Sequence, residues 1–312
     1  KPLLQLKPSS EEDYCTQLKL GPCFLGAAFS HSNTVQLYSL DNLEALPAVQ
    51  LESGSLSEFT FISENTFAWC DKAGSLGVFD LREGKSRVQR FQEEWFSMDA
   101  CGFNLAASSN KGMTVWDLRT MSEKRKFSEV HADHEDVTCV RFNPDYSHIL
   151  VSCAEDNLMS ICNVESQEED PYILMSVEEP GLKVGFVGPN IYCVTISRYW
   201  EYQPNLDDDL APPLLVKKLS AFELQETNPE ANYFISSLSL GVQEQLLVGS
   251  HQGQLFSYPS QGPFYSGHFH TSVIRDALSF KEYIITGSED SSIVAWQLTE
   301  ANGMQIETPV II

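Results

Sequence analysis

Four side chains near the C-terminal end of the chain combine an imidazole, a hydroxyl, a carboxylate and an indole at fixed spacing. Asp290 follows Thr286 by four residues and precedes Trp296 by six, and His270 stands ahead of them, with His268 competing for the histidine position. A buried indole N–H and a buried imidazole both need hydrogen-bond partners, and a fully connected polar network fixes the geometry of the elements that carry it. The chemistry expected of this group is therefore structural hydrogen bonding.

The same spacing recurs in the middle of the chain, where Ser152 and Asp156 follow His134 and Cys162 takes the tryptophan position. A zinc ion held by His131 and His134 is the alternative. The hydrogen-bonded group accounts for His134 without a metal, and we therefore favour it.

Motifs of common hydrolases and nucleotide-binding enzymes are missing: the sequence contains no G-x-S-x-G, no Walker loop and no H-E-x-x-H. The acidic run Asp207, Asp208 and Asp209 lies between Pro204 and Pro213 with no histidine or cysteine nearby, which favours a solvated acidic loop over a metal site. We expect no catalytic residue, no cofactor and no metal.

The eight cysteines are scattered along the chain and form no C-x-x-C pair, which predicts free thiols in a reducing compartment. We therefore expect an intracellular protein of the cytoplasm, the nucleus or both. The longest apolar runs are strand-sized and far short of the roughly 18 residues that a membrane helix needs.

The net charge of −23 is unevenly distributed. Residues 1–141 carry 14 Lys and Arg against 20 Asp and Glu, a net of −6, and residues 142–312 carry 6 against 23, a net of −17. Such a surface repels nucleic acid and anionic membrane and attracts a basic protein. The alternative is that the acidity only keeps the protein soluble.

A strand–turn–strand unit ending in an aromatic residue recurs along the chain. Its aromatic positions are Tyr38, Phe79, Trp116, Tyr258 and Trp296. With two further units between Trp116 and Tyr258, they fit a period of about 40 residues, the length of a four-stranded propeller blade. A further alternating apolar strand precedes each unit. The pattern predicts an all-β, seven-bladed β-propeller of four-stranded antiparallel blades, because one blade cannot bury both of its faces alone.

The whole chain, residues 1–312, is predicted to form this single domain. The expected blades are 16–52, 56–92, 94–130, 134–178, 181–224, 231–266 and 272–312. The ring would be closed by either 3–7 or 304–309, and the ambiguous stretch 214–224 is assigned as strand.

The group around Trp296 resembles the tetrad of the WD-repeat family, in which a turn Asp, a His, a strand Ser or Thr and a Trp form one hydrogen-bonded chain. The resemblance covers the whole sequence, but most copies are degenerate. Two members of the family are candidates for the nearest resemblance. Residues 134–144 and 232–240 are similar to the favoured member, and residues 151–157 and 273–277 are similar to its competitor, the WD-repeat subunit of the methylosome.

Arg82 and Arg119 end two consecutive units, after Phe79-Asp80-Leu81 and Trp116-Asp117-Leu118. Paired W-D-x-R motifs of this kind resemble those of WD-repeat substrate receptors of cullin-type ubiquitin ligases, whose arginines face an adaptor. The favoured alternative is that both arginines pair with their own aspartates.

Two further surfaces are candidates for interaction. Basic residues concentrate between positions 82 and 126, so a basic sector on blades two and three would oppose an acidic sector on blades four to seven and could bind two partners of opposite charge. In the fifth blade, Trp200 and Tyr202 precede the acidic run and suggest a recognition surface, unless they are that blade's strand residues.

The combined features predict a non-catalytic scaffold that presents an acidic propeller surface to a basic protein such as a ribosomal protein or a histone. The alternatives are a substrate receptor of a cullin-type ubiquitin ligase and a non-catalytic subunit of a protein arginine methyltransferase complex.

Overall fold

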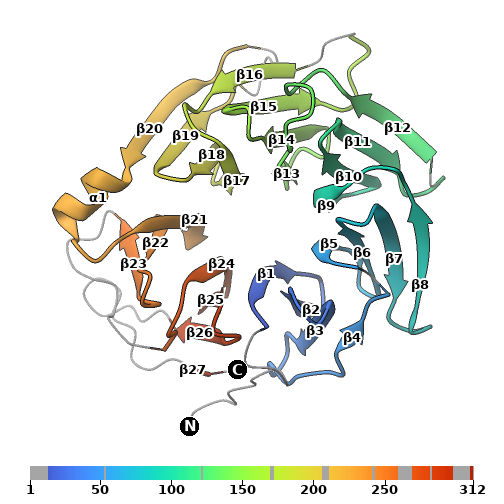
Figure 1. The fold of residues 1–312 in the computed structure, drawn as a ribbon, viewed down its shortest axis with the longest axis horizontal. Coiled ribbons are helices and arrows are strands. Elements are labelled where there is room, and N and C mark those ends of the chain that lie inside the picture. Colours follow the sequence, from blue (N-terminus) through green and yellow to red (C-terminus); the bar gives the residue numbers. More distant parts are fainter. Residues whose placement is uncertain are drawn as a thin grey trace. The chain divides into compact units, whose positions relative to one another are not determined.

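The computed structural model describes residues 13–52, 54–120, 122–168, 172–205, 211–240, 243–258, 269–281, 283–297 and 310–311. The fold is that of an all-β, seven-bladed β-propeller: every described sheet is antiparallel, and each joins strands that follow one another in the chain (Figure 1). The chain divides into two compact units, residues 57–220 and residues 1–56 with 221–312.

The unit of residues 57–220 contains four sheets of four strands, with β5 beginning one residue earlier. The strands are β5 Leu56–Ser63, β6 Thr66–Asp71, β7 Ser75–Asp80, β8 Lys85–Arg90; β9 Trp95–Cys101, β10 Asn104–Ser109, β11 Gly112–Asp117, β12 Ser122–Phe127; β13 Cys139–Phe142, β14 Ile149–Cys153, β15 Leu158–Asn163, β16 Tyr172–Ser176; and β17 Gly181–Val187, β18 Asn190–Thr195, β19 Arg198–Gln203, β20 Leu214–Ser220.

The other unit contains three sheets and a short helix. Its elements are β1 Cys15–Leu20, β2 Phe24–Phe29, β3 Thr34–Ser39, β4 Val49–Gln50; α1 Ala221–Thr227; β21 Tyr233–Leu240, β22 Gln243–Gly249, β23 Leu255–Tyr258; and β24 Ile274–Phe280, β25 Tyr283–Ser288, β26 Ile293–Gln297, β27 Val310–Ile311. Among the described residues the sheet of β21–β23 has three strands, and β27 pairs with β26. The segments 3–7 and 304–309, predicted to close the ring, lie outside the described residues.

Burial follows the position of a strand within its sheet. All six residues of β10 are buried, whereas five of the six residues of β8 are exposed. The apolar cores lie between consecutive sheets: Trp95 and Met98 pack with Ala68 and Leu76 of the preceding sheet. A single sheet cannot cover both of its apolar faces, so each sheet depends on its neighbour.

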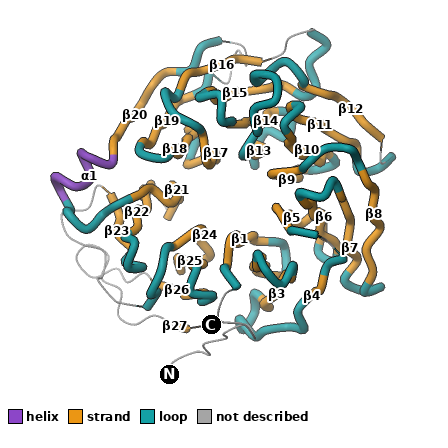
Figure 2. Tube along the Cα trace, viewed as in Figure 1, coloured by secondary structure: helices purple, strands orange, loops and turns teal. Residues whose placement is uncertain are grey.

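The prediction of strand for residues 214–224 is wrong at its end. Strand β20 stops at Ser220, and α1 covers Ala221–Thr227 (Figure 2). The helix segment is rich in Ala, Leu, Glu and Gln, which have high helix propensity, and it buries Leu224. No helix in the described part of the chain is long and apolar enough to cross a lipid bilayer.

Candidate functional site

In the fourth sheet the polar group is built around His131. Its Nδ1 lies 2.9 Å from Asp156 Oδ2 and its Nε2 lies 2.7 Å from Ser152 Oγ. The assignment of His134 to this position is wrong: His134 is exposed and has a φ of 68°. The N–H of Ala132 also donates to Asp156 at 3.0 Å, which anchors the loop at residues 131–132 and leaves the turn at His134 in solvent.

The tryptophan position of this sheet is occupied by a chain of small polar groups. Ser152 Oγ lies 2.6 Å from Ser160 Oγ, which lies 3.4 Å from the Cys162 thiol. Burial alone would raise the pKa of Asp156, but the hydrogen bonds from His131 and from the Ala132 N–H outweigh it and lower that pKa.

In the last sheet the structure brings His270, Thr286, Asp290 and Trp296 together. Trp296 Nε1 donates to Thr286 Oγ1 at 2.8 Å, and that hydroxyl lies 2.7 Å from His270 Nε2. His270 Nδ1 lies 3.4 Å from Asp290 Oδ1 and only 2.7 Å from Ser292 Oγ, a contact that the sequence pattern did not predict. The competing residue His268 lies outside the described residues.

Serine, histidine and aspartate in this order have the geometry of a nucleophilic triad, but here they are sealed from solvent. Ser152 and Thr286 have no exposed surface, so neither hydroxyl can reach a substrate. Their role is to connect buried polar groups and to fix the positions of the strands. Within the described ranges no group of three or more His, Cys, Asp and Glu is arranged to hold a metal ion.

Arg82 and Arg119 both pair with the aspartate two residues before them. Arg82 Nη2 donates to Asp80 Oδ2 at 2.7 Å, and Arg119 Nε donates to Asp117 Oδ1 at 3.0 Å. In each turn the backbone N–H of the arginine also donates to the same carboxylate. These hydrogen bonds hold the pKa of both carboxyl groups well below its usual range. The arginine side chains remain 68% and 61% exposed.

Trp200 and Tyr202 are buried, at 5% and 7% exposure, so the prediction that they form a recognition surface is wrong. They lie two residues apart on β19 and therefore on the same face, where their rings stack in the core between two sheets. Lys218 Nζ covers the Trp200 ring at 4.2 Å. The adjoining residues Asp207, Asp208 and Asp209 lie outside the described residues.

Five carboxylates gather at one end of the third and fourth sheets, which we call the acidic end. They are Glu94 between β8 and β9; Asp133, Glu135 and Asp136 between β12 and β13; and Glu155 between β14 and β15. The N–H of Glu155 donates to the Asp136 carbonyl at 3.0 Å, which brings two of these loops together. Burial and the neighbouring charge of Glu94 raise the pKa of Asp136, and the charge of Lys72 opposes this shift only in part. In the described part of the chain none of the five forms an ion pair.

A buried charged network that sequence reasoning missed connects the innermost strands of three sheets. Arg141 on β13 donates from Nη2 to Glu58 Oε1 on β5 at 2.6 Å, and Glu58 also accepts from the hydroxyl of Ser97 on β9. Glu58 is 1% exposed. The hint in the sequence was that Glu58 is the only charged residue of its inner strand, and its partner lies 83 residues away.

Comparisons with known proteins agree with this architecture. Residues 125–163 match the family model "WD domain, G-beta repeat". The chain is 30% identical to the WD repeat-containing protein 89 homolog of Dictyostelium discoideum, over 91% of this chain and 82% of that protein. It is 24% identical to the WD repeat-containing protein GTS1 of Arabidopsis thaliana, over 86% and 77% of the two chains.

A shorter similarity, 24% identity over 45% of this chain and 37% of the relative, is to the histone-binding protein MSI1 of Saccharomyces cerevisiae. Among solved structures, the β-propeller domain of Cps50 (Swd1) from Myceliophteria thermophila aligns with a TM-score of 0.73 at 10% identity, over 95% of this chain and all of that one. The computationally designed protein Ika8 aligns with a TM-score of 0.68 at 14% identity, over 99% and 89%. From its repeats, its buried histidine groups and these similarities, the chain belongs to the WD-repeat family of β-propeller proteins.

Proposed function

We propose that this protein is a non-catalytic scaffold that binds a basic protein at its acidic end. The observation that carries the proposal is that Glu94, Asp133, Glu135, Asp136 and Glu155 lie in loops at the same end of the sheets and that none of them forms an ion pair among the described residues, although Lys72 is close enough to Asp136 to lower its pKa in part. Crowded carboxylates of this kind are stabilised when lysine or arginine side chains of a partner approach them.

The composition of the chain supports the same class of partner. A net charge of −23 gives a long-range attraction for a basic protein and repels nucleic acid and anionic membrane. Histones and ribosomal proteins both have the required basic segments, and one relative is named as a histone-binding protein. Such partners are met in the cytoplasm and the nucleus, which is where we expect the protein to act.

The two alternatives have less support. A ubiquitin-ligase substrate receptor would use Arg82 and Arg119 to contact an adaptor, but both guanidinium groups already pair with Asp80 and Asp117. A subunit of an arginine methyltransferase complex would co-purify with an enzyme that loses activity without this chain.

Binding to purified core histones and to lysine-rich ribosomal proteins, measured over a series of salt concentrations, tests the proposal. The informative variant is Glu94→Gln/Asp136→Asn/Glu155→Gln, which removes three charges from the acidic end. We expect its affinity to fall about tenfold or more at low salt, because close interfacial charge pairs each contribute on the order of a kcal/mol or more. Asp136→Asn should be well tolerated, since the charged form of Asp136 is already disfavoured.

The matched control is Glu64→Gln/Asp145→Asn/Glu168→Gln, which removes the same charge from exposed residues at the opposite end of the sheets. This control should retain the affinity to within about twofold, since charges farther than a Debye length are screened. Equal losses in the two triple variants would mean that only the overall charge attracts the partner, and the acidic end would then not be the binding site.

A further inference from the structure

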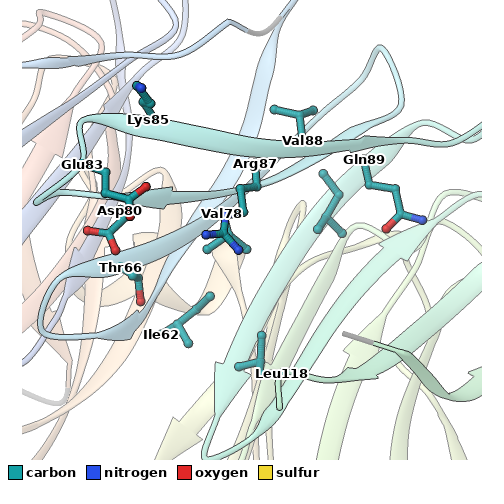
Figure 3. A pocket seen from close by; sticks show the side chains of 11 residues that line it. Ile62, Thr66, Val78, Asp80, Glu83, Lys85, Arg87, Val88, Gln89 and Leu118 are labelled. Carbon is teal, nitrogen blue, oxygen red and sulfur yellow. The ribbon is translucent and has the colours of Figure 1, made fainter. Parts of the chain in front are cut away.

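A groove with a volume of about 450 Å³ lies between the second and third sheets, within residues 57–220 (Figure 3). Its apolar lining consists of Ile62, Leu76, Val78, Val88 and Leu118, and the polar residues around it are Thr66, Asp80, Glu83, Lys85, Arg87 and Gln89. The volume is in the range of sites that hold small ligands or a few side chains of a peptide.

The strand that borders this groove is basic, although the chain as a whole is acidic. Lys85, Arg87 and Arg90 are exposed on β8, and no ion pair involving any of them is present in the described part of the chain. Lys85 and Arg87 both line the groove, and Figure 3 shows the Arg87 side chain directed from β8 toward Val78. Two cations that form no ion pair with any described residue therefore stand beside an apolar surface.

The carboxylates near the groove do not neutralise these cations. Asp80 is bound by Arg82 through both of its oxygens, and that pair is complete without Lys85 or Arg87. Glu83 is exposed in the turn between β7 and β8, and no ion pair of Glu83 with either cation is found among the described residues.

The edge of β8 adds backbone groups to this surface. The strand order β5-β6-β7-β8 places β8 last, and no strand in the described ranges pairs with its outer side. An unpaired edge presents N–H and C=O groups to an extended peptide, while side-chain pockets supply specificity.

We propose that this groove binds an extended acidic peptide segment of a partner protein, in which carboxylates flank one branched aliphatic side chain. The aliphatic side chain would enter the space between Val78, Ile62 and Leu118, and the carboxylates would pair with Arg87 and Lys85. A nucleic acid fits less well, because the groove floor is aliphatic and Asp80 and Glu83 stand on its rim. The groove is separate from the acidic end, and it would bind an acidic partner where the acidic end would bind a basic one.

Selection of a random 12-residue peptide phage library on the full chain tests this proposal. We expect enrichment of peptides with two or more Asp or Glu residues around a Leu, Ile or Val. The affinity of a fluorescein-labelled enriched peptide is then measured by anisotropy on the wild type and on variants that retain the unfolding midpoint of the wild type.

The informative pair of variants is Arg87→Glu and Arg90→Glu, which make the same charge change on the same strand. Residues three apart in a strand point to opposite faces, and only Arg87 lines the groove. Arg87→Glu should weaken peptide binding about tenfold or more, and Arg90→Glu should change it less than about threefold. Val78→Thr keeps the β-branched shape but adds a hydroxyl, and it should weaken binding about threefold or more.

Three results would overturn the proposal. The first is a library that yields no acidic consensus. The second is an enriched peptide whose affinity responds equally to Arg87→Glu and Arg90→Glu, because the groove would then not be its site. The third is displacement of the peptide by a 12-nucleotide single-stranded RNA at comparable concentration, which would assign the basic strand to nucleic acid. None of these results bears on histone binding at the acidic end.

Discussion

His131 Nε2 lies 2.7 Å from the hydroxyl of Ser152, in a site where both side chains are buried. Together with Asp156, this contact ties the loop that precedes the fourth sheet to the second strand of that sheet. The stability of the sheet should therefore depend on His131 and not on His134.

Replacing His131 with asparagine should lower the free energy of unfolding by about 2–3 kcal/mol, because the shorter side chain cannot reach Asp156 and Ser152 at once. His134→Asn is the matched control. Asparagine tolerates the positive φ of that exposed position, so the change should stay within about 0.5 kcal/mol. Urea-induced unfolding followed by circular dichroism measures both, and equal values would contradict the assignment of His131.

Thr286→Val should destabilise the last sheet by about 2–3 kcal/mol without changing the shape of the side chain. The hydroxyl that it removes accepts the hydrogen bond from Trp296 Nε1 and contacts His270 Nε2, so two buried polar groups lose their partner. Thr120→Val, in an exposed turn, is the control and should change stability by less than about 0.5 kcal/mol. Thermal and urea unfolding of the two variants provide the comparison.

Glu58→Gln should cost about 3–5 kcal/mol, since it leaves the guanidinium of Arg141 partly buried without its carboxylate. The double variant Glu58→Gln/Arg141→Met should recover part of this loss, because no charge then remains without a partner. A double-mutant cycle from urea unfolding gives the coupling between the two residues. A coupling near zero would show that Arg141 and Glu58 do not act together.

The stability of the fifth sheet should depend on pH through Glu179. Burial would raise the pKa of Glu179, but hydrogen bonds from Ser197 and Thr195 outweigh it and lower the pKa to about 2, against an ordinary value of 4.5. A depressed pKa in the folded state contributes stability that is present above pH 4.5 and is lost as the pH falls toward 2.

Glu179→Gln should accordingly lose less stability than the wild type when the pH is lowered from 5 toward 2, as urea midpoints at each pH would show. Glu168→Gln, at an exposed position of the preceding sheet, should follow the wild-type curve. If the Glu179→Gln curve also falls as steeply as that of the wild type, the carboxylate is not ionised by these contacts.

Arg119→Ala should change the free energy of unfolding by less than about 1 kcal/mol, because exposed ion pairs contribute little. The variant therefore separates binding from folding. Co-purification of a ubiquitin-ligase adaptor with the wild type and its loss with Arg119→Ala, at an unchanged unfolding midpoint, would favour the receptor alternative. Unchanged adaptor binding would exclude Arg119 as its contact.

Local pattern was enough to predict the sheets and most of one polar group. The alternation of apolar residues and the recurring aromatic positions led to seven antiparallel sheets, because strand burial depends on residues two apart. Thr286, Asp290 and Trp296 lie in one hairpin, where register alone brings them close: Ile284 pairs with Trp296 and Thr286 with Val294. In this hairpin the spacing of the residues along the chain therefore determines which side chains meet.

Whatever depended on a loop conformation or on a neighbouring sheet was decided by tertiary structure. The turn before the fourth sheet selects His131 over His134, and packing between two sheets buries Trp200 and Tyr202. Glu58 meets Arg141 across 83 residues of sequence, and the groove beside β8 is lined both by residues of the second sheet and by Leu118, which follows β11 of the next sheet. Such contacts join residues that are far apart in the chain, and no local period encodes the distance between them.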